Sequence, residues 1–340
     1  MNDDPDHLLS AVFINAAGRN PLVIAKVHPQ FDSGKVVFRQ VLPHHTYDWG
    51  DCVGKTVVGW NIEYQTDDVD AAPCHYWLMG AKPLNGPMPS NREYFSWHLS
   101  ETARANPKQP IHVPQHARFL ADALLGINKH PRVALYEGLQ DAGLLEQCLV
   151  SLYATPQLHL GHVTYSSPAL AALESPLVAA TKSDPLKWHS MAQIQLPRTT
   201  KVIPASQLIP RAIYENSYLS VVAETSPGLD QFFVTEKTGK ALAAGRIFLL
   251  QGGPGYLRHL RDLGFKTFAP YVDESYDEIL DLDDRTAAIL AELTRLSKLD
   301  LTALYHQLMP VLEHNQNLMY SGKLNDPAKR FLLEIKSRHS

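Results

Sequence analysis

The chain has little of several features that would assign it to a class at once. Its 340 residues include three cysteines, Cys52, Cys74 and Cys148, and no Cys-x-x-Cys pair. An odd number of widely spaced cysteines argues against a disulfide framework and against a cysteine-rich zinc site. No apolar run approaches the roughly 20 residues that span a bilayer, and the N-terminus is acidic, unlike a secretory signal. We therefore expect a cytoplasmic protein with no membrane span.

An excess of positive charge is also missing. The 31 basic and 35 acidic residues give a net charge of −4, which does not favour a dedicated nucleic-acid-binding protein. The chain lacks Gly-x-Gly-x-x-Gly after its first strand and Gly-x-x-x-x-Gly-Lys-Ser/Thr, which argues against a Rossmann dehydrogenase and a P-loop NTPase. The composition, with 45% hydrophobic residues, is that of an ordinary globular protein. The length predicts two domains.

Proline-rich segments at 83–89 and 106–110 read as a loop and a linker, so we place a domain boundary near residue 115. The first part contains strand-like runs at 11–15, 22–27, 35–42 and 56–62, with a helix expected at 98–104. After the boundary, the patterns indicate an apolar run at 119–125 that suits a strand or a short helix, a helix at 131–140 and a strand at 149–153.

The clearest pattern is an alternation of strands and helices in the second part. Strands are expected at 218–223, 247–250 and 265–268, and the helices at 236–244 and 254–263 are closed by Gly245 and Gly264. Such short connections predict an α/β fold with a parallel sheet. Amphipathic helices follow at 286–298, 301–319 and 328–336.

Three segments of this alternation fall at the carboxyl edge of the expected sheet, where open parallel sheets bind ligands. Helix N-termini, glycines and an early-helix lysine suit a diphosphate, and a carboxylate suits ribose or sugar hydroxyls. Each group also has a structural interpretation as a helix cap, a tight turn or a solvated charge. The site residues that we infer are Glu224, Thr235, Glu236, Lys237, Gly252, Gly253, Gly255 and Tyr256.

The same stretch carries a resemblance to a family. The Thr-Glu-Lys at 235–237, the following Ala-Gly and the Gly-Gly-Pro-Gly-Tyr-Leu at 252–257 resemble the donor-binding segment of the α1,3/4-fucosyltransferases. They are more similar still to bacterial and phage-type orphan glycosyltransferases. Asn128 to Arg132 resembles the family's Asn-Pro-Arg type loop. The likeness spares the N-terminal part of the chain.

The resemblance implies a GT-B fold, in which two Rossmann-like domains face a cleft. It implies an acceptor-side domain at 1–115, a donor domain at 116–300 and C-terminal helices at 301–340. By the same resemblance, Lys237 and Arg132 neutralise the diphosphate, Glu236 binds donor hydroxyls, and Glu224 has a donor-site or structural role. Phe233 stands where the fucosyltransferases have tyrosine, so the donor sugar is not assigned.

An inverting transferase needs a general base, and the similar family keeps its carboxylate base in the N-terminal domain. Our candidates are Asp48, flanked by Tyr47 and Trp49, and then Glu63, with the His44-His45 pair after them. The Asp-x-Asp triplets at 68–70 and 281–283 match metal-dependent transferases, but we interpret both as solvated charge.

The sequence therefore predicts an inverting, metal-independent glycosyltransferase without a cofactor. Its partners would be a nucleoside-diphosphate sugar and an acceptor hydroxyl on a glycan or a small molecule. Two alternatives stay open. One is a phage-type transferase that glycosylates a modified DNA base, and the other is a catalytically inactive GT-B binding or scaffold subunit.

Overall fold

The computed structural model describes residues 9–14, 22–27, 35–40, 50–61, 73–83, 85–127, 129–153, 193–195, 202–204, 208–225 and 231–339. The chain divides into two compact units. The first comprises residues 1–100, 230–234 and 321–340, and the second comprises 101–229 and 235–320. This division differs from the expected one, because the change of unit comes at residue 100 and the last helix belongs to the first unit.

The first unit is built on a parallel sheet with the strand order β3-β4-β5-β7. These strands are Val36–Gln40, Thr56–Asn61, Tyr76–Met79 and Arg92–Tyr94. Two antiparallel pairs accompany it: β1 (Leu9–Ile14) with β2 (Leu22–Val27), and β6 (Ala81–Pro83) with β13 (Gln231–Phe233). All four strands expected in this part of the sequence are confirmed, with shifted ends.

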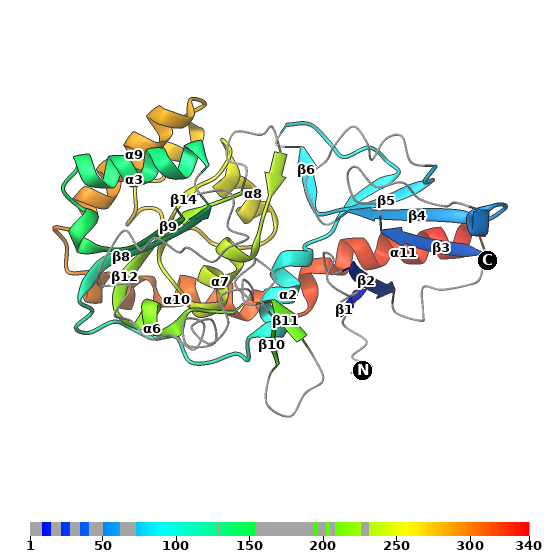
Figure 1. Ribbon diagram of the computed structural model, residues 1–340, viewed down its shortest axis with the longest axis horizontal. Helices are drawn as coiled ribbons and strands as arrows, with labels where there is room; N and C mark the ends of the chain where they lie inside the picture. Colours follow the sequence, from blue (N-terminus) through cyan, green and yellow to red (C-terminus); the bar gives the residue numbers. More distant parts are fainter. Residues whose placement is uncertain are drawn as a thin grey trace. The chain divides into compact units, whose positions relative to one another are not determined.

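The core of the first unit lies between this sheet and α11 (Asp326–His339), which runs beside β3 and β4 in Figure 1. Ala328, Leu332 and Ile335 recur at helical spacing, so they form one apolar stripe. That stripe is buried against Val58 and Trp60 of the sheet.

The second unit holds a parallel sheet with the order β14-β12-β8-β9 (Figure 1). Its strands are β8 (Phe119–Ile127), β9 (Cys148–Tyr153), β12 (Ser217–Ala223) and β14 (Phe248–Gln251). The chain adds β9 on one side of β8 and then β12 and β14 on the other. The strand order therefore reverses between β8 and β12, and this is where doubly wound sheets bind ligands.

Helices accompany these strands much as the sequence predicts. They are α2 (Trp97–Ala105), α3 (His130–Asp141), α6 (Arg211–Glu215), α7 (Glu236–Ala244), α8 (Tyr256–Asp262), α9 (Leu282–Leu296) and α10 (Leu301–Met319). Short 3-10 turns occur at Gly50–Cys52, Leu145–Gln147, Ser275–Glu278 and Lys323–Asn325, and β10 (Gln193–Gln195) pairs with β11 (Val202–Pro204). No described helix has the length and apolar character needed to cross a bilayer.

One element expected from the sequence is wrong. Residues 265–268 are buried at both ends but do not form a strand. Side chains bond their backbone groups instead: Asn315 accepts from the Lys266 N–H at 2.8 Å and donates to its carbonyl at 2.8 Å, and Glu274 accepts from the Phe268 N–H at 2.5 Å. Because these backbone groups are already satisfied, the segment needs no neighbouring strand.

Candidate functional site

Two segments lie at the point where the strand order of the second sheet reverses. Arg132 lies in the first turn of α3, just after β8, and Glu224 follows β12 directly. Arg132 is buried, with 6% of its surface exposed. Desolvation lowers the pKa of Arg132, and the charges of Glu224 and Glu236 oppose that shift. The structure therefore brings the predicted residues from both strands into one electrostatic cluster.

Glu224 is the hub of this cluster. It is 2% exposed, and its carboxylate accepts hydrogen bonds from the Thr235 N–H and hydroxyl at 3.2 and 2.6 Å. It also accepts from the Thr238 and Tyr256 hydroxyls at 2.5 and 3.1 Å and from the Thr225 N–H at 3.3 Å. These donors belong to the protein, so Glu224 ties the starts of α7 and α8 to the end of β12. This geometry favours the structural role that the sequence left open.

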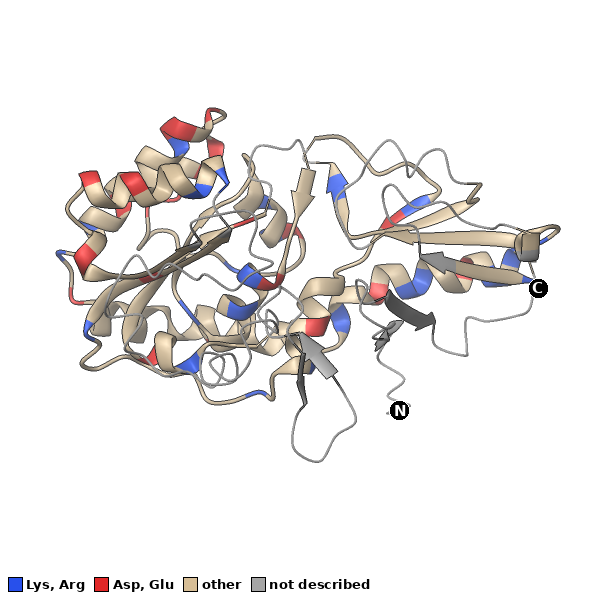
Figure 2. Cartoon of the chain, viewed as in Figure 1, with Lys and Arg blue, Asp and Glu red and all other residues tan. Residues whose placement is uncertain are grey.

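Lys237 and Glu236 lie at the more accessible side of the cluster, in the first turn of α7. The Lys237 ammonium donates to Glu236 at 2.9 Å, and the two side chains are 20% and 15% exposed. It lies 3.3 Å from the hydroxyls of Thr225 and Thr235. Thr235 also caps the helix by accepting from the Lys237 N–H. The start of α7 therefore presents an ion pair of opposite charges. Figure 2 colours the basic and acidic residues along the chain.

Lys240 is a residue of this cluster that sequence reasoning missed. It lies three residues after Lys237 and four after Glu236, which places all three on one side of α7. The side chain is half-buried. Desolvation lowers the pKa of Lys240, Glu236 opposes the shift and Lys237 adds to it. The helical spacing from Lys237 was the available signal. Lys240 adds a third cationic side chain beside the carboxylates of Glu224 and Glu236, and the charge of Asp122 acts on it as well.

The Gly-Gly-Pro-Gly segment has a structural explanation in the described contacts. A Cβ on Gly252 would lie 2.5 Å from the Tyr256 ring, and Gly255 has φ +74°. The Gly253 carbonyl accepts the Tyr256 N–H at 3.2 Å. The glycines thus let the chain turn tightly from β14 into α8 around a buried aromatic ring.

The N-terminus of α8 is already capped. The Leu257 N–H donates to both oxygens of the Asp277 carboxylate at 2.9 and 3.1 Å, and the Arg258 N–H donates to one of them at 3.3 Å. We expected a phosphate to receive such backbone donors, because helix N-termini favour anions. Here a carboxylate of the protein takes that position, so the anion-binding groups of the cluster are its side chains.

Several predicted residues fall elsewhere. Asp48, Glu63, the His44-His45 pair and the 68–70 triplet lie outside the described residues. Asp281, in the second triplet, caps α9 by accepting the N–H groups of Asp283 and Asp284 at 2.9 and 3.0 Å. In the part of the chain that the structure describes, no group of three or more His, Cys, Asp or Glu side chains could hold a metal ion.

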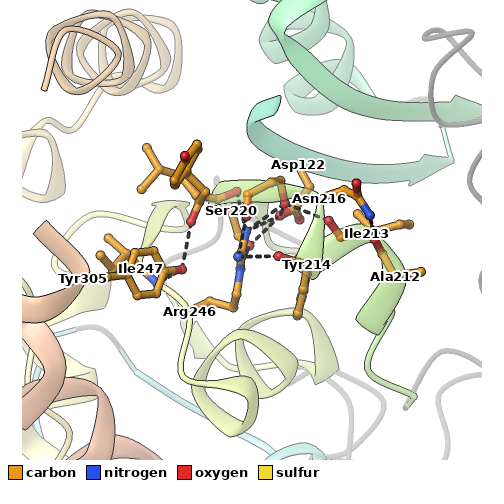
Figure 3. Close-up of polar contacts among 12 residues, drawn as sticks. Asp122, Ala212, Ile213, Tyr214, Asn216, Ser220, Arg246, Ile247 and Tyr305 are labelled. Carbon is orange, nitrogen blue, oxygen red and sulfur yellow. Dashed lines mark hydrogen bonds and ion pairs between the residues drawn. The ribbon is translucent and has the colours of Figure 1, made fainter. Parts of the chain in front are cut away.

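A second charged cluster lies near the amino ends of the same strands (Figure 3). Arg246, just before β14, forms an ion pair with Asp122 of β8 at 3.0 Å, and both side chains are almost fully buried. The guanidinium also donates to the carbonyls of Tyr214, Ser217 and Leu219 at 2.7–2.9 Å. Asp122 in turn accepts from two serine hydroxyls. Fixed protein groups therefore satisfy this cluster on every side.

Comparison with family models, curated proteins and solved structures finds no match to this chain.

Proposed function

We propose that the protein is a glycosyltransferase of the GT-B type, and that its second unit binds a nucleoside-diphosphate sugar where the strand order reverses between β8 and β12. The observation that carries the proposal is the convergence of Arg132, Lys237 and Lys240 on that point. A diphosphate leaving group is stabilised by cationic side chains that are already in position and partly desolvated.

The ion pair on α7 gives the donor two contacts. When a diphosphate arrives, Lys237 exchanges the Glu236 carboxylate for a phosphate oxygen, because a phosphate carries more charge. Glu236, released from the lysine, then accepts hydrogen bonds from ribose or sugar hydroxyls. Glu224 stays bonded to Thr235, Thr238 and Tyr256 and keeps α7 in place.

The reaction is a displacement with inversion at the anomeric carbon. The acceptor hydroxyl forms a bond to that carbon, its proton passes to a carboxylate base, and the bond to the diphosphate oxygen breaks. The nucleoside diphosphate leaves with the electron pair and is held by the cationic side chains. Asp48 and Glu63 of the first unit remain our candidates for the base. A glycan or small-molecule hydroxyl is the proposed acceptor.

Binding of sugar nucleotides tests the donor site. Thermal-shift measurements with GDP-, UDP- and dTDP-sugars should show one series that stabilises the protein, since a ligand selective for the folded state raises its melting temperature. A CMP-sugar, which has a single phosphate, should stabilise less. Arg132→Ala should lose most of the shift while Lys298→Ala, which changes an exposed lysine of the same unit, should keep it. Equal shifts in both variants would overturn the site.

Turnover tests the reaction. Transfer should continue in EDTA, because the cationic side chains take the part that a divalent ion plays in metal-dependent transferases. Loss of activity in EDTA that manganese or magnesium restores would overturn the metal-independent mechanism. Sugar-nucleotide binding without transfer to any of a broad acceptor panel, modified DNA included, would overturn the enzyme assignment and leave a binding protein.

A further inference from the structure

The first unit contains a cavity of about 600 Å³ that the proposed function does not use. It lies at the amino ends of three neighbouring strands, where Lys35 precedes β3, Thr56 begins β4 and His75 precedes β5. A cavity of this size falls within the range of small-molecule sites, about 300–1,000 Å³. The described residues that line it are Lys35, Cys52, Val53, Gly54, Lys55, Thr56, Val57, Pro73, His75 and His339.

The charge of this lining has one sign. Two lysines and two histidines line the cavity, and the described lining includes no aspartate or glutamate. The lysines come from different chain segments, one before β3 and the other in the turn before β4. Cationic side chains gathered around a concave surface raise the local positive potential, which attracts an anion. The lining therefore favours a negatively charged ligand.

His75 lines the cavity, and its Nδ1 accepts a hydrogen bond from the protein. The Val57 N–H donates to Nδ1 of His75 at 3.0 Å, so this nitrogen carries no proton. In a neutral imidazole the proton then resides on Nε2. His75 thus offers an N–H to an anion without needing to be charged, and its ring is exposed.

The turn before β4 adds a backbone feature. Gly54 has φ +72°, and a Cβ at this position would meet nothing within 4 Å. Open space over a left-handed glycine leaves room for a ligand beside Lys55. Gly54-Lys55-Thr56 resembles the end of a P-loop in letters alone, because Thr56 opens a strand and not a helix. Val53, Val57 and Pro73 supply apolar wall.

We propose that this cavity is a second ligand site, which binds a small phosphorylated molecule. Lys35, Lys55 and the His75 Nε2–H contact the phosphate, and the apolar wall accommodates the rest of the molecule. Lysine is a common phosphate ligand as a mobile point charge. The site belongs to the first unit and does not depend on the donor site of the second.

Calorimetric titration tests this site once the donor site is silenced. The starting protein carries Arg132→Ala, Lys237→Ala and Lys240→Ala, which removes the three cationic side chains of the donor site from the second unit. Pyrophosphate should still bind to it. Adding Lys35→Ala and Lys55→Ala should weaken that binding at least tenfold, the loss expected for charge-assisted contacts to phosphate. Adding Lys323→Ala, a change of an exposed lysine in the same unit, should leave it unaltered.

The outcomes separate the alternatives. No pyrophosphate binding by the starting protein, or equal binding with and without Lys35 and Lys55, overturns the site. Both lysines are at the surface or half-buried, so the variant should keep its melting temperature, and the Lys35→Arg and Lys55→Arg pair should restore binding. Titrations with inorganic phosphate and with a hexose phosphate then identify the source of the phosphate group. Tighter hexose phosphate binding indicates an organic ligand, and equal binding indicates free phosphate, with the site supported in either case.

Discussion

The second sheet carries a charged cluster at each end of its strands, and the two clusters are built differently. At the amino ends, Arg246 and Asp122 are sealed from solvent, and fixed carbonyls and hydroxyls meet both charges. At the carboxyl ends, Glu224 is equally buried and satisfied, but Lys237 and Glu236 remain 20% and 15% exposed. Arg132, Lys237 and Lys240 gather there, and the charges of Glu224, Glu236 and Asp122 act on them.

We interpret the cluster at the amino ends as structural and the cluster at the carboxyl ends as the candidate binding site. A buried ion pair is costly to desolvate and persists when protein groups complete its hydrogen bonds, as they do around Arg246. A cluster whose ion pair is partly exposed can exchange a protein partner for a ligand. The carboxyl end of the sheet combines a buried charge with a partly exposed ion pair. Glu224 positions α7, and α7 carries the ion pair of Lys237 and Glu236.

The largest effect is expected at the amino end. Arg246→Met should destabilise the protein by about 3–5 kcal/mol, because it leaves Asp122 buried without its partner charge. The carbonyls of Tyr214, Ser217 and Leu219 lose their donor as well. Urea denaturation followed by circular dichroism measures the change in unfolding free energy.

A paired substitution controls for this result. Asp122→Leu combined with Arg246→Met removes both charges, so it should recover part of the stability that Arg246→Met loses. If the single variant is as stable as the wild type, the buried pair does not hold the strand ends together.

The next effect is expected at the carboxyl end and concerns binding. Lys237→Ala should weaken sugar-nucleotide binding by about tenfold to a hundredfold, the loss of a charge-assisted contact worth about 1.5–3 kcal/mol. Its unfolding free energy should change little, because the ammonium is partly solvated. Calorimetry on Lys237→Ala and on the exposed-site control Lys298→Ala compares the two. Unchanged affinity in folded Lys237→Ala would remove this residue from the site.

The fold was predictable wherever local patterns dominate. The helix over 236–244 and its left-handed Gly245 are confirmed to the residue, because a capping threonine and a closing glycine mark both ends. Residues 265–268 show where prediction from local patterns fails. Their Phe-Lys-Thr-Phe pattern suits a strand, yet the backbone of Lys266 is bonded by Asn315, 49 residues away in the sequence. Such long-range partners leave no local signal.

The sequence predicted which residues gather at the candidate site, but it was less informative about the role of each residue. Parallel strands bring the residues that follow them to one edge, so Arg132, Glu224 and Lys237 were found together. The structural role of Glu224 follows from Thr238 and Tyr256, because their hydroxyls donate hydrogen bonds to its carboxylate. The capping of α8 by Asp277 depends on a segment 20 residues away in sequence, and no spacing rule indicates it.

A smaller effect should show whether Tyr256 is structural or binds the donor. Tyr256→Phe keeps the buried ring and removes the hydroxyl that donates to Glu224 at 3.1 Å. We expect a loss of about 0.5–1.5 kcal/mol in unfolding free energy, the ordinary value of one hydrogen bond. Sugar-nucleotide affinity should stay within about twofold of the wild type. Tyr271→Phe, at an exposed position, is the control. A large loss of affinity with unchanged stability would give Tyr256 a direct contact to the ligand.

The smallest effect is expected from Lys240, whose side chain is half-buried. Its pKa is lowered by desolvation, so in the ligand-free protein the folded state binds its proton less readily than the unfolded state. The folded chain therefore bears a desolvation penalty while Lys240 is charged, and stability from this group rises as the pH rises through its lowered pKa. Lys240→Met removes the penalty and should be more stable than wild type at pH 7, by about 1 kcal/mol or less.

That advantage should narrow as the pH rises from 7 to 9.5, because a lowered pKa makes the stability of the wild type rise with pH. Urea denaturation at both pH values measures the difference. Comparing the two proteins at each pH cancels the contribution of the buried tyrosines, which both share. With sugar nucleotide present the order should reverse, because the ligand then supplies the missing negative charge to Lys240. If Lys240→Met is less stable than wild type at pH 7 without ligand, the lysine is already satisfied by the protein, and the carboxyl-end cluster is as complete as the one around Arg246.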